Sequence, residues 1–216
     1  MKRRDFSLVC GAAIVGSALV PSTALAQGKP PEPGVDFVIL DKPAAVEAPA
    51  GKIEVVEFFW YSCPHCNVFE PTFDAWSKRA PKDIVVRRVP IAFRDDFVPQ
   101  QRLFYALDAM GLVEKLHRKV FTAIHVEKQK LDRMDAIADW VAKQGVDKTK
   151  FLEQYNSFSV ATKATRASSL QNAYRIEGVP ALGVAGRFYT DSTLAKSMER
   201  GLQVVDFLAA GIRNGR

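Results

Sequence analysis

Cysteine is scarce in this chain: 216 residues contain three, Cys10, Cys63 and Cys66. A secreted protein that stabilises its fold with disulfides spreads its cysteines along the chain. Here two of the three are separated by only two residues, so a bridge between them would constrain almost none of the polypeptide. A structural disulfide framework is therefore excluded, and a Cys63–Cys66 bridge would be a chemically working one.

The chain also lacks a large excess of one charge and a long apolar run, and it contains few histidines. Thirty Lys and Arg oppose 24 Asp and Glu, and no basic stripe is interleaved with aromatics, so we expect no nucleic-acid partner. The apolar run 8–20 is too short to span a bilayer. His117 and His125 do not have the spacing of zinc ligands, and we expect them to be ordinary helix residues. No metal and no cofactor are expected.

The N-terminus has the pattern of a secretory signal peptide, residues 1–26. Lys2-Arg3-Arg4 precedes the apolar run, and Ala24-Leu25-Ala26 places the cleavage before Gln27. Arg3-Arg4-Asp5-Phe6 also resembles a twin-arginine export motif, and the alternative is an ordinary charged leader. Cys10 would leave with the leader, and the remaining 190 residues would carry a net charge of +4. Either export route ends outside the cytoplasm.

Hydrophobic periodicity predicts the order strand, strand, helix, strand, helices, hairpin, helix after a Pro- and Gly-rich tether at 27–34. The expected strands are 35–40, 52–59, 83–90, 181–184 and 187–189, with a two-residue turn between the last two. The expected helices are 64–79, 100–110, 112–125, 133–143, 148–156, 160–175 and 192–212, the last interrupted near Gly201, with Asp132 and Asp147 as N-caps and Gly111 and Gly145 as ends. The unit 52–90 predicts a parallel strand pair with a crossover helix.

The motif Cys63-Pro64-His65-Cys66 joins the apolar strand 52–59 to the first helix. Cys63 would be the N-cap, where unpaired backbone N–H groups and the helix dipole favour a thiolate over a thiol. Pro64 would fall at N1, where a missing N–H costs nothing. His65 can add a positive charge or a donor beside the sulfur, and Cys66 returns one turn later, close enough to bridge.

A stabilised thiolate gives this pair a direction of electron flow. It favours the reduced form, so the disulfide form becomes an oxidant. Each pKa unit is worth about 1.4 kcal/mol, or roughly 30 mV for a two-electron couple. We therefore expect His65 to set how oxidising the site is. The alternatives for a lone C-x-x-C motif are half a zinc knuckle or a chance pair.

Four stretches carry a resemblance to a known family. They are Val56-Glu57-Phe58-Phe59 with the motif that follows it, Asn156-Ser157-Phe158, Gly178-Val179-Pro180-Ala181 and Gly186-Arg187-Phe188-Tyr189. In this order, over nearly all of the chain after the leader, the sequence resembles the DsbA family of bacterial periplasmic thiol:disulfide interchange proteins. That family is a known example of a depressed cysteine pKa and a strongly oxidising couple, so the direction argued from Cys63 is not an independent result.

The resemblance implies an α/β thioredoxin fold, a mixed sheet flanked by helices, built from residues 35–96 and 176–216, with an inserted all-helical domain at 97–175. It implies a periplasmic, monomeric oxidoreductase that donates its Cys63–Cys66 disulfide to reduced, unfolded or partly folded secreted proteins. Cys63 would be the exposed nucleophile and Cys66 its buried partner. A quinone-linked membrane oxidase of the DsbB type would reoxidise the dithiol.

Glu57 is a further candidate, because a carboxylate in a strand covered on both faces is costly unless it is paired or protonated. It could lie beneath the first helix and exchange a proton with Cys66; the alternative is that it points past a strand edge into water. Glu70, one turn after Cys66, either joins this cluster or lies on a solvated helix face. The family pattern implies a basic partner near the third strand, where Val86 occupies the expected position and its neighbours Arg87 and Arg88 are the substitutes.

Pro180 would by itself be a routine turn proline, since X-Pro bonds are cis in only about 5–6% of cases. The resemblance implies a cis Val179–Pro180 bond facing the cysteines. Val179 would then offer its backbone to an extended substrate segment, and the proline ring would keep an N–H group and metal ions away from the sulfurs.

Two rival functions remain open on the sequence. One keeps the fold and reverses the flow, as a periplasmic reductase or isomerase; the Pro-His pair argues against it. The other is a metal carrier that uses Cys63, Cys66 and a histidine. The redox equilibrium with glutathione separates an oxidase from a reductase or isomerase. Metal analysis of the purified protein tests the metal carrier.

Overall fold

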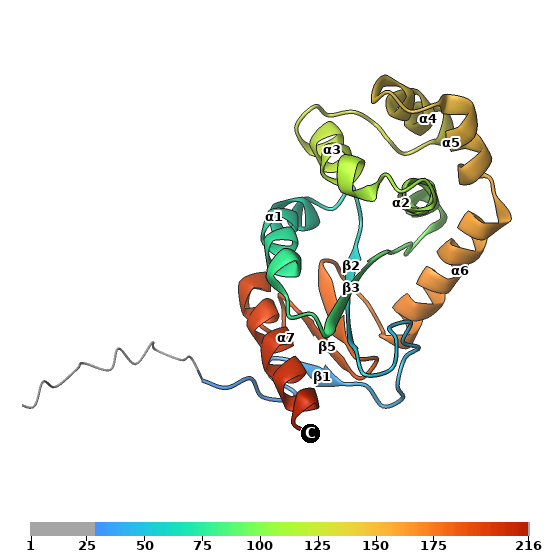
Figure 1. The fold of residues 1–216 in the computed structure, drawn as a ribbon. Coiled ribbons are helices and arrows are strands. Elements are labelled where there is room, and N and C mark those ends of the chain that lie inside the picture. Colours follow the sequence, from blue (N-terminus) through green and yellow to red (C-terminus); the bar gives the residue numbers. More distant parts are fainter. Residues whose placement is uncertain (1–28, 216) are drawn as a thin grey trace, which may run out of the picture. The chain divides into compact units, whose positions relative to one another are not determined.

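A five-stranded mixed sheet forms the centre of residues 29–215, the part of the chain that the computed structural model describes (Figure 1). The predicted leader, with Cys10, lies outside these residues. The strand order is β1-β5-β4-β2-β3. The strands are β1 (Val38–Ile39), β2 (Ile53–Phe59), β3 (Ile84–Pro90), β4 (Ala181–Val184) and β5 (Phe188–Asp191). β2 and β3 are parallel, and the other pairs are antiparallel.

β2 is the buried central strand that its near-continuous apolar run predicts. All seven of its residues are buried, including two glutamates. It leads through a short loop into α1 (Pro64–Arg79), which crosses over to β3. The parallel register sets Glu57 of β2 opposite Arg88 of β3. This register brings a carboxylate and a guanidinium together beneath α1.

Helices cover both faces of the sheet. α1 and α7 (Met198–Arg213) pack on one face, where Phe73 and Trp76 of α1 meet Leu202 and Val205 of α7. On the other face Val56 and Phe58 of β2 belong to a second cluster that extends into the helices between β3 and β4. Burial of this apolar surface is the main source of stability.

Five α-helices follow one another between β3 and β4, as the sequence predicts, and a short 3₁₀ helix that was not predicted precedes them. They are η1 (Asp95–Phe97), α2 (Val98–Ala109), α3 (Val113–His125), α4 (Met134–Lys143), α5 (Lys148–Tyr155) and α6 (Phe158–Ala173). Figure 1 shows α6 running back alongside the sheet, and it contacts β3. None of the helices within residues 29–215 combines the length and apolar character that a membrane crossing needs.

The side-chain caps explain several helix boundaries. Asp147 caps α5 as predicted, with Oδ1 accepting from the N–H of Lys150 at 3.0 Å. The prediction for Asp132 is wrong, because Arg133 occupies the N-cap of α4 and gives no side-chain cap bond. Gly111 and Gly145 follow α2 and α4 with positive φ, as expected of helix ends.

The first strand and the last helix are both shorter than predicted. A turn at 34–36, held by the Glu32 N–H and Asp36 Oδ2 at 2.9 Å, leaves only Val38–Ile39 as β1. α7 begins at Met198 rather than at residue 192, because Ser197 caps it through the N–H of Arg200 at 3.1 Å. It is not interrupted at Gly201, which is buried against β4 and lies inside a continuous helix.

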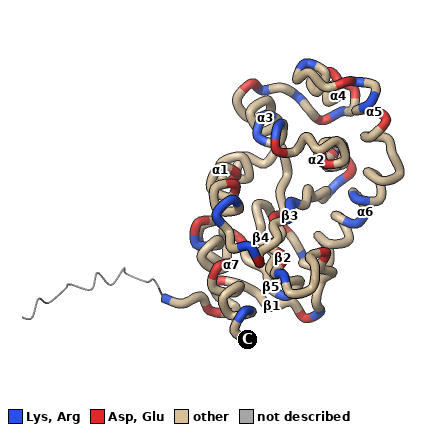
Figure 2. Tube along the Cα trace, in the orientation of Figure 1, with Lys and Arg blue, Asp and Glu red and all other residues tan. Residues whose placement is uncertain are grey.

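The predicted β-hairpin is confirmed, with β4 and β5 antiparallel. The predicted two-residue turn is wrong, because Val184 pairs with Phe188 and three residues, 185–187, connect the strands. Ala185 and Gly186 have positive φ, 51° and 66°, a backbone for which alanine is the less suited of the two residues. Acidic and basic residues are interspersed along the described chain rather than gathered by sign (Figure 2).

Candidate active site

Cys63 is the N-cap of α1, as the sequence predicts. Its backbone is extended, φ −78° and ψ 118°, and its sulfur accepts a hydrogen bond from the N–H of Cys66 at an N to Sγ distance of 3.4 Å. Pro64 is the first helical residue, where its missing N–H leaves no bond unmade. The helix therefore begins on the sulfur itself.

The two sulfurs lie in different environments. Cys66 is completely buried, whereas Cys63 keeps 7% of its surface, less than the exposed position that we expected. Hydrogen bonding with Cys66 and with backbone N–H groups lowers the pKa of Cys63 to about 6, against the opposing effect of burial. Burial and the neighbouring Cys63 raise the pKa of Cys66. Both cysteines are free thiols in this structure.

His65 is exposed and acts on Cys63 less strongly than the sequence alone indicates. Its charge lowers the pKa of Cys63, but it is the smallest of the contributing causes, behind Cys66 and the backbone N–H groups. The expectation that His65 sets how oxidising the site is stays a prediction; in this structure the partner thiol and the backbone N–H groups lower the pKa of Cys63 more than the His65 charge does.

Val179 and Pro180 face the cysteines, and the peptide bond between them is cis, as the resemblance implied. The Cys63 thiol donates to the Val179 carbonyl oxygen at 3.3 Å. This contact joins residues 116 positions apart and places the segment before β4 directly against the reactive sulfur.

Glu57, Arg88 and Glu70 form a buried ion-pair cluster beneath α1. Arg88 lies 3.3 Å from Glu57 (Nε to Oε2) and 2.8 Å from Glu70 (Nη2 to Oε1). Glu57 is 1% exposed and Glu70 4%, so neither carboxylate points into open water. Burial and the nearby Glu70 raise the pKa of Glu57 to about 8, while Arg88 opposes the shift. Glu57 also acts on Cys66 electrostatically, raising its pKa.

Arg88 is thus the basic partner that the sequence left open, and Arg87 is not. Side chains alternate across a strand, so neighbouring residues of β3 point to opposite faces. The guanidinium of Arg87 contacts Glu47 at 2.6 Å and the buried Glu54 at 3.7 Å. The cluster beneath α1 belongs to Arg88 alone of the two.

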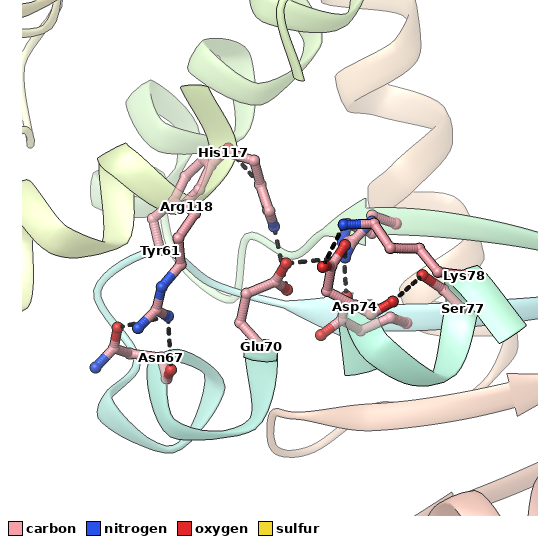
Figure 3. Close-up of polar contacts among 10 residues, drawn as sticks. Tyr61, Asn67, Glu70, Asp74, Ser77, Lys78, His117 and Arg118 are labelled. Carbon is pink, nitrogen blue, oxygen red and sulfur yellow. Dashed lines mark hydrogen bonds and ion pairs between the residues drawn. The ribbon is translucent and has the colours of Figure 1, made fainter. Parts of the chain in front are cut away.

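His117, expected to be an ordinary helix residue, extends this cluster (Figure 3). It is 4% exposed, its Nδ1 lies 2.8 Å from the hydroxyl of Tyr61, and its Nε2 lies 3.3 Å from Oε2 of Glu70. The sequence did carry a signal, because position 117 falls on the apolar stripe of 113, 116, 120, 121 and 124 in α3.

Two further residues that sequence reasoning missed hold the loop before Cys63. The amide of Gln100 on α2 accepts from the N–H of Ser62 at 3.2 Å and donates to its hydroxyl at 2.7 Å. His125 of α3 donates through Nε2 to the Tyr61 carbonyl oxygen at 2.8 Å. Neither helix is near this loop in sequence, so no local pattern could have revealed the contacts.

These features define a class of protein. A cysteine at the start of a helix, following the central strand of a mixed sheet and facing a cis-proline, is the arrangement of a thioredoxin-fold disulfide oxidoreductase. Residues 54–212 match the family model described as the DSBA-like thioredoxin domain. The chain belongs to this family of thiol:disulfide oxidoreductases.

This chain is similar to known relatives and to solved structures over most of its length. The thiol:disulfide interchange protein DsbA of Burkholderia cepacia is 46% identical over 195 residues, which cover 89% of this chain and 92% of that protein. The DsbA of Bordetella parapertussis is 44% identical, covering 93% of each chain. The crystal structure of Pseudomonas aeruginosa DsbA is similar with a TM-score of 0.80 at 41% identity, over 84% of this chain and 94% of that one.

Proposed function

We propose that this protein oxidises pairs of cysteines in exported proteins by transferring its Cys63–Cys66 disulfide to them. One observation carries the direction: the pKa of Cys63 is lowered to about 6 while burial raises that of Cys66. A site that stabilises one thiolate at neutral pH stabilises its own dithiol form, so its disulfide is a strong oxidant.

The transfer takes two exchange steps. A substrate thiolate attacks Sγ of Cys63 in the disulfide form; the Cys63–Cys66 bond breaks, and Cys66 leaves as a thiolate that takes up a proton. A second substrate thiolate then attacks the substrate sulfur of the mixed disulfide, and Cys63 leaves as a thiolate. Two electrons pass from the substrate to the enzyme, and the substrate gains a disulfide.

Burial assigns opposite roles to the two sulfurs. Cys63 keeps a small exposed surface and is the sulfur that an incoming thiolate can reach, whereas Cys66 has none. A buried thiolate leaving group needs a proton close by. Glu57 supplies it, since its pKa of about 8 keeps it protonated at neutral pH. His65 and Pro64 complete the active-site turn.

Val179 and Pro180 form the docking edge for the substrate. The Val179 carbonyl accepts from Cys63 in this structure, so its backbone lies where an extended chain bound to that sulfur would pass. An extended segment paired with this backbone would present its cysteine to Cys63 without requiring a particular side chain. Such binding suits broad substrate choice among unfolded or partly folded chains.

The cellular setting follows from this chemistry. Each transfer leaves the enzyme as a dithiol, so continued turnover needs an electron acceptor, and we assign that role to a quinone-linked membrane oxidase of the DsbB type. A periplasmic location agrees with the leader-like pattern at 1–26 and with the oxidising compartment in which such disulfides persist. We assign the working form as a monomer.

The reduction potential tests the proposal. Equilibration of the purified protein with glutathione should give a potential close to −120 mV, the value of the strongly oxidising members of this class. A potential near the −270 mV of thioredoxin would favour a reductase instead. An assay with a reduced two-cysteine peptide should show stoichiometric disulfide formation by the oxidised protein.

A further inference from the structure

Two buried carboxylates share a single guanidinium beside the redox pair. If Glu57 and Glu70 were both ionised, the single charge of Arg88 would leave the cluster with a net negative charge among buried side chains. Like charges this close do not both ionise readily, and the pair therefore holds one proton between them at neutral pH. The chemistry at Cys66 depends on which carboxyl group carries that proton.

His117 approaches only one of the two. Its Nε2 lies 3.3 Å from Oε2 of Glu70, and its Nδ1 lies 2.8 Å from the hydroxyl of Tyr61. Tyr61 is buried, and burial raises the pKa of its hydroxyl, so the phenol stays protonated and can donate to Nδ1. The ring proton of neutral His117 then lies on Nε2, which faces Oε2 of Glu70 at 3.3 Å (Figure 3). Within the described residues, neither of these buried atoms makes a hydrogen bond to any other group, so each is the available partner of the other.

We propose that His117 is a positioning residue of the redox site: by donating to Glu70 it holds that group as the carboxylate and so places the shared proton on Glu57, next to Cys66. This inference rests on the proposed function for its meaning in catalysis, but the placement of the proton is a property of the resting protein. Tyr61 acts one step further out, by fixing the tautomer of His117.

The position of the shared proton affects how readily Cys66 leaves as a thiolate. With Glu57 protonated, the Cys66 thiolate that forms during exchange is free of the Glu57 charge, which raises the pKa of Cys66. With the proton on Glu70, it would meet a carboxylate and be destabilised as a leaving group. Burial lowers the pKa of His117 and keeps the ring neutral at neutral pH, so its effect is that of a fixed hydrogen-bond donor.

A hollow of about 320 Å³ between α1 and α3 gives this pair access to solvent, since Glu70 and His117 both line it. Its other charged lining groups come from α1, α3 and β3. They are Asp74, Lys78, Glu114, Arg118 and Arg88. Opposite signs are mixed here, so no single charge forces His117 into its protonated form. The hollow is the route by which the shared proton exchanges with water.

The test is a site-resolved titration by NMR of protein labelled with carbon-13 in the glutamate carboxyl groups. In the unaltered dithiol protein at pH 7, Glu57 should be protonated and Glu70 ionised, and nitrogen-15 shifts should show His117 neutral with its proton on Nε2. A reversed proton assignment, or a proton on Nδ1, would overturn the inference without any variant.

Variants then separate positioning from mere packing. His117→Leu should move the proton, so that Glu57 becomes ionised and Glu70 protonated at pH 7, and the rate of disulfide transfer should fall by on the order of tenfold, one pKa unit at the leaving group. His117→Gln keeps an amide donor toward Glu70 and should restore both readouts. Lys119→Gln, at an exposed position of the same helix, is the matched control.

A double-variant cycle makes the inference sharper. Glu70→Gln leaves Glu57 with Arg88 to itself and should ionise Glu57 at pH 7. Adding His117→Leu to Glu70→Gln should then change the Glu57 titration no further. Full additivity would show that His117 acts by another route. If the unaltered protein fails to oxidise dithiols, the proposed function falls, while the proton assignments still decide the role of His117.

Discussion

The backbone N–H of Cys66 points at the sulfur of Cys63, with 3.4 Å between nitrogen and sulfur. Both atoms of this bond belong to the Cys63-Pro64-His65-Cys66 motif and lie within one helical turn. A thiolate at Cys63 accepts it more strongly than a thiol does, because hydrogen bonds to ionised groups are the stronger ones. The redox bias is therefore built into the first turn of α1, and other groups adjust it.

The two cysteines should respond differently to serine. Cys63→Ser removes the sulfur that substrate reaches and should abolish dithiol oxidation. Cys66→Ser keeps the Cys63 thiolate, which can attack a disulfide in an oxidised substrate, but removes the thiol that would displace the substrate again, so mixed disulfides should accumulate. Non-reducing gel electrophoresis with mass spectrometry measures both. Mixed disulfides on Cys63→Ser and none on Cys66→Ser would show the roles to be reversed.

Replacing His65 should weaken the oxidant by a small amount. In His65→Ala the pKa of Cys63 should rise from about 6, but by less than about one unit, because the His65 charge is the smallest contributing cause. The reduction potential should drop by at most about 30 mV. Ultraviolet absorbance of the thiolate gives the titration. Val68→Ala, at an exposed position on the same helix, is the control. A titration that does not move would leave His65 without an electrostatic role.

The reduced protein should unfold at a higher temperature than the oxidised one, with a defined pH dependence. The pKa of Cys63 in the folded dithiol is about 6, below its ordinary value. A lowered pKa contributes stability that is present above the unfolded pKa, about 8.5, and is lost as the pH falls through 6. At pH 7 we expect about 1 kcal/mol, discounted for partial contact with solvent, or roughly 2–4 °C in Tm.

Paired melting curves from pH 5 to 9 measure this difference, and comparing two redox forms of one chain removes the contributions they share. Cys63→Ser has no thiolate and should lose the pH dependence. Equal melting temperatures for the two redox forms of the unaltered protein across this range would contradict the expectation.

Removing Arg88 should destabilise the fold severely. Arg88→Met leaves Glu57 and Glu70 buried without their cation, and breaking a buried pair in this way typically costs about 3–5 kcal/mol. Arg94→Met is the matched control, because Arg94 pairs with Asp96 on the exposed surface, where ion pairs contribute about 1 kcal/mol or less. Denaturant unfolding compares the two. A loss below about 1 kcal/mol for Arg88→Met would mean that the carboxylates take up protons and need no cation.

The sequence predicted those parts of the site that are local in the chain. Cys63 as N-cap, Pro64 at N1 and the buried β2 follow from the order of residues over about one strand and one helix, where capping and burial preferences act directly. The cis bond before Pro180 came from family resemblance. Amino-acid composition and hydrophobic periodicity do not predict a cis bond, because trans is the common isomer of X-Pro bonds.

The parts that could not be predicted depend on register and on contacts between distant segments. The choice between Arg87 and Arg88 is decided by which face of β3 each occupies, and only the pairing of Glu57 with Arg88 settles it. His117 lies 47 positions after Glu70, and nothing local tells a histidine on a buried stripe which carboxylate it meets. The predicted start of α7 at residue 192 is wrong, because Ser197 is the N-cap of this helix.

The bonds from Gln100 and His125 to residues 61 and 62 have a consequence for how such proteins can be re-engineered. The hydrogen bonds from α2 and α3 hold the turn that carries the nucleophile, so other helices of the same length could not replace these two without losing that support. A chimera that keeps the sheet and its motif but exchanges α2 and α3 for foreign helices would loosen this turn. Its redox chemistry would then be set by the donor of the helices as much as by the two cysteines.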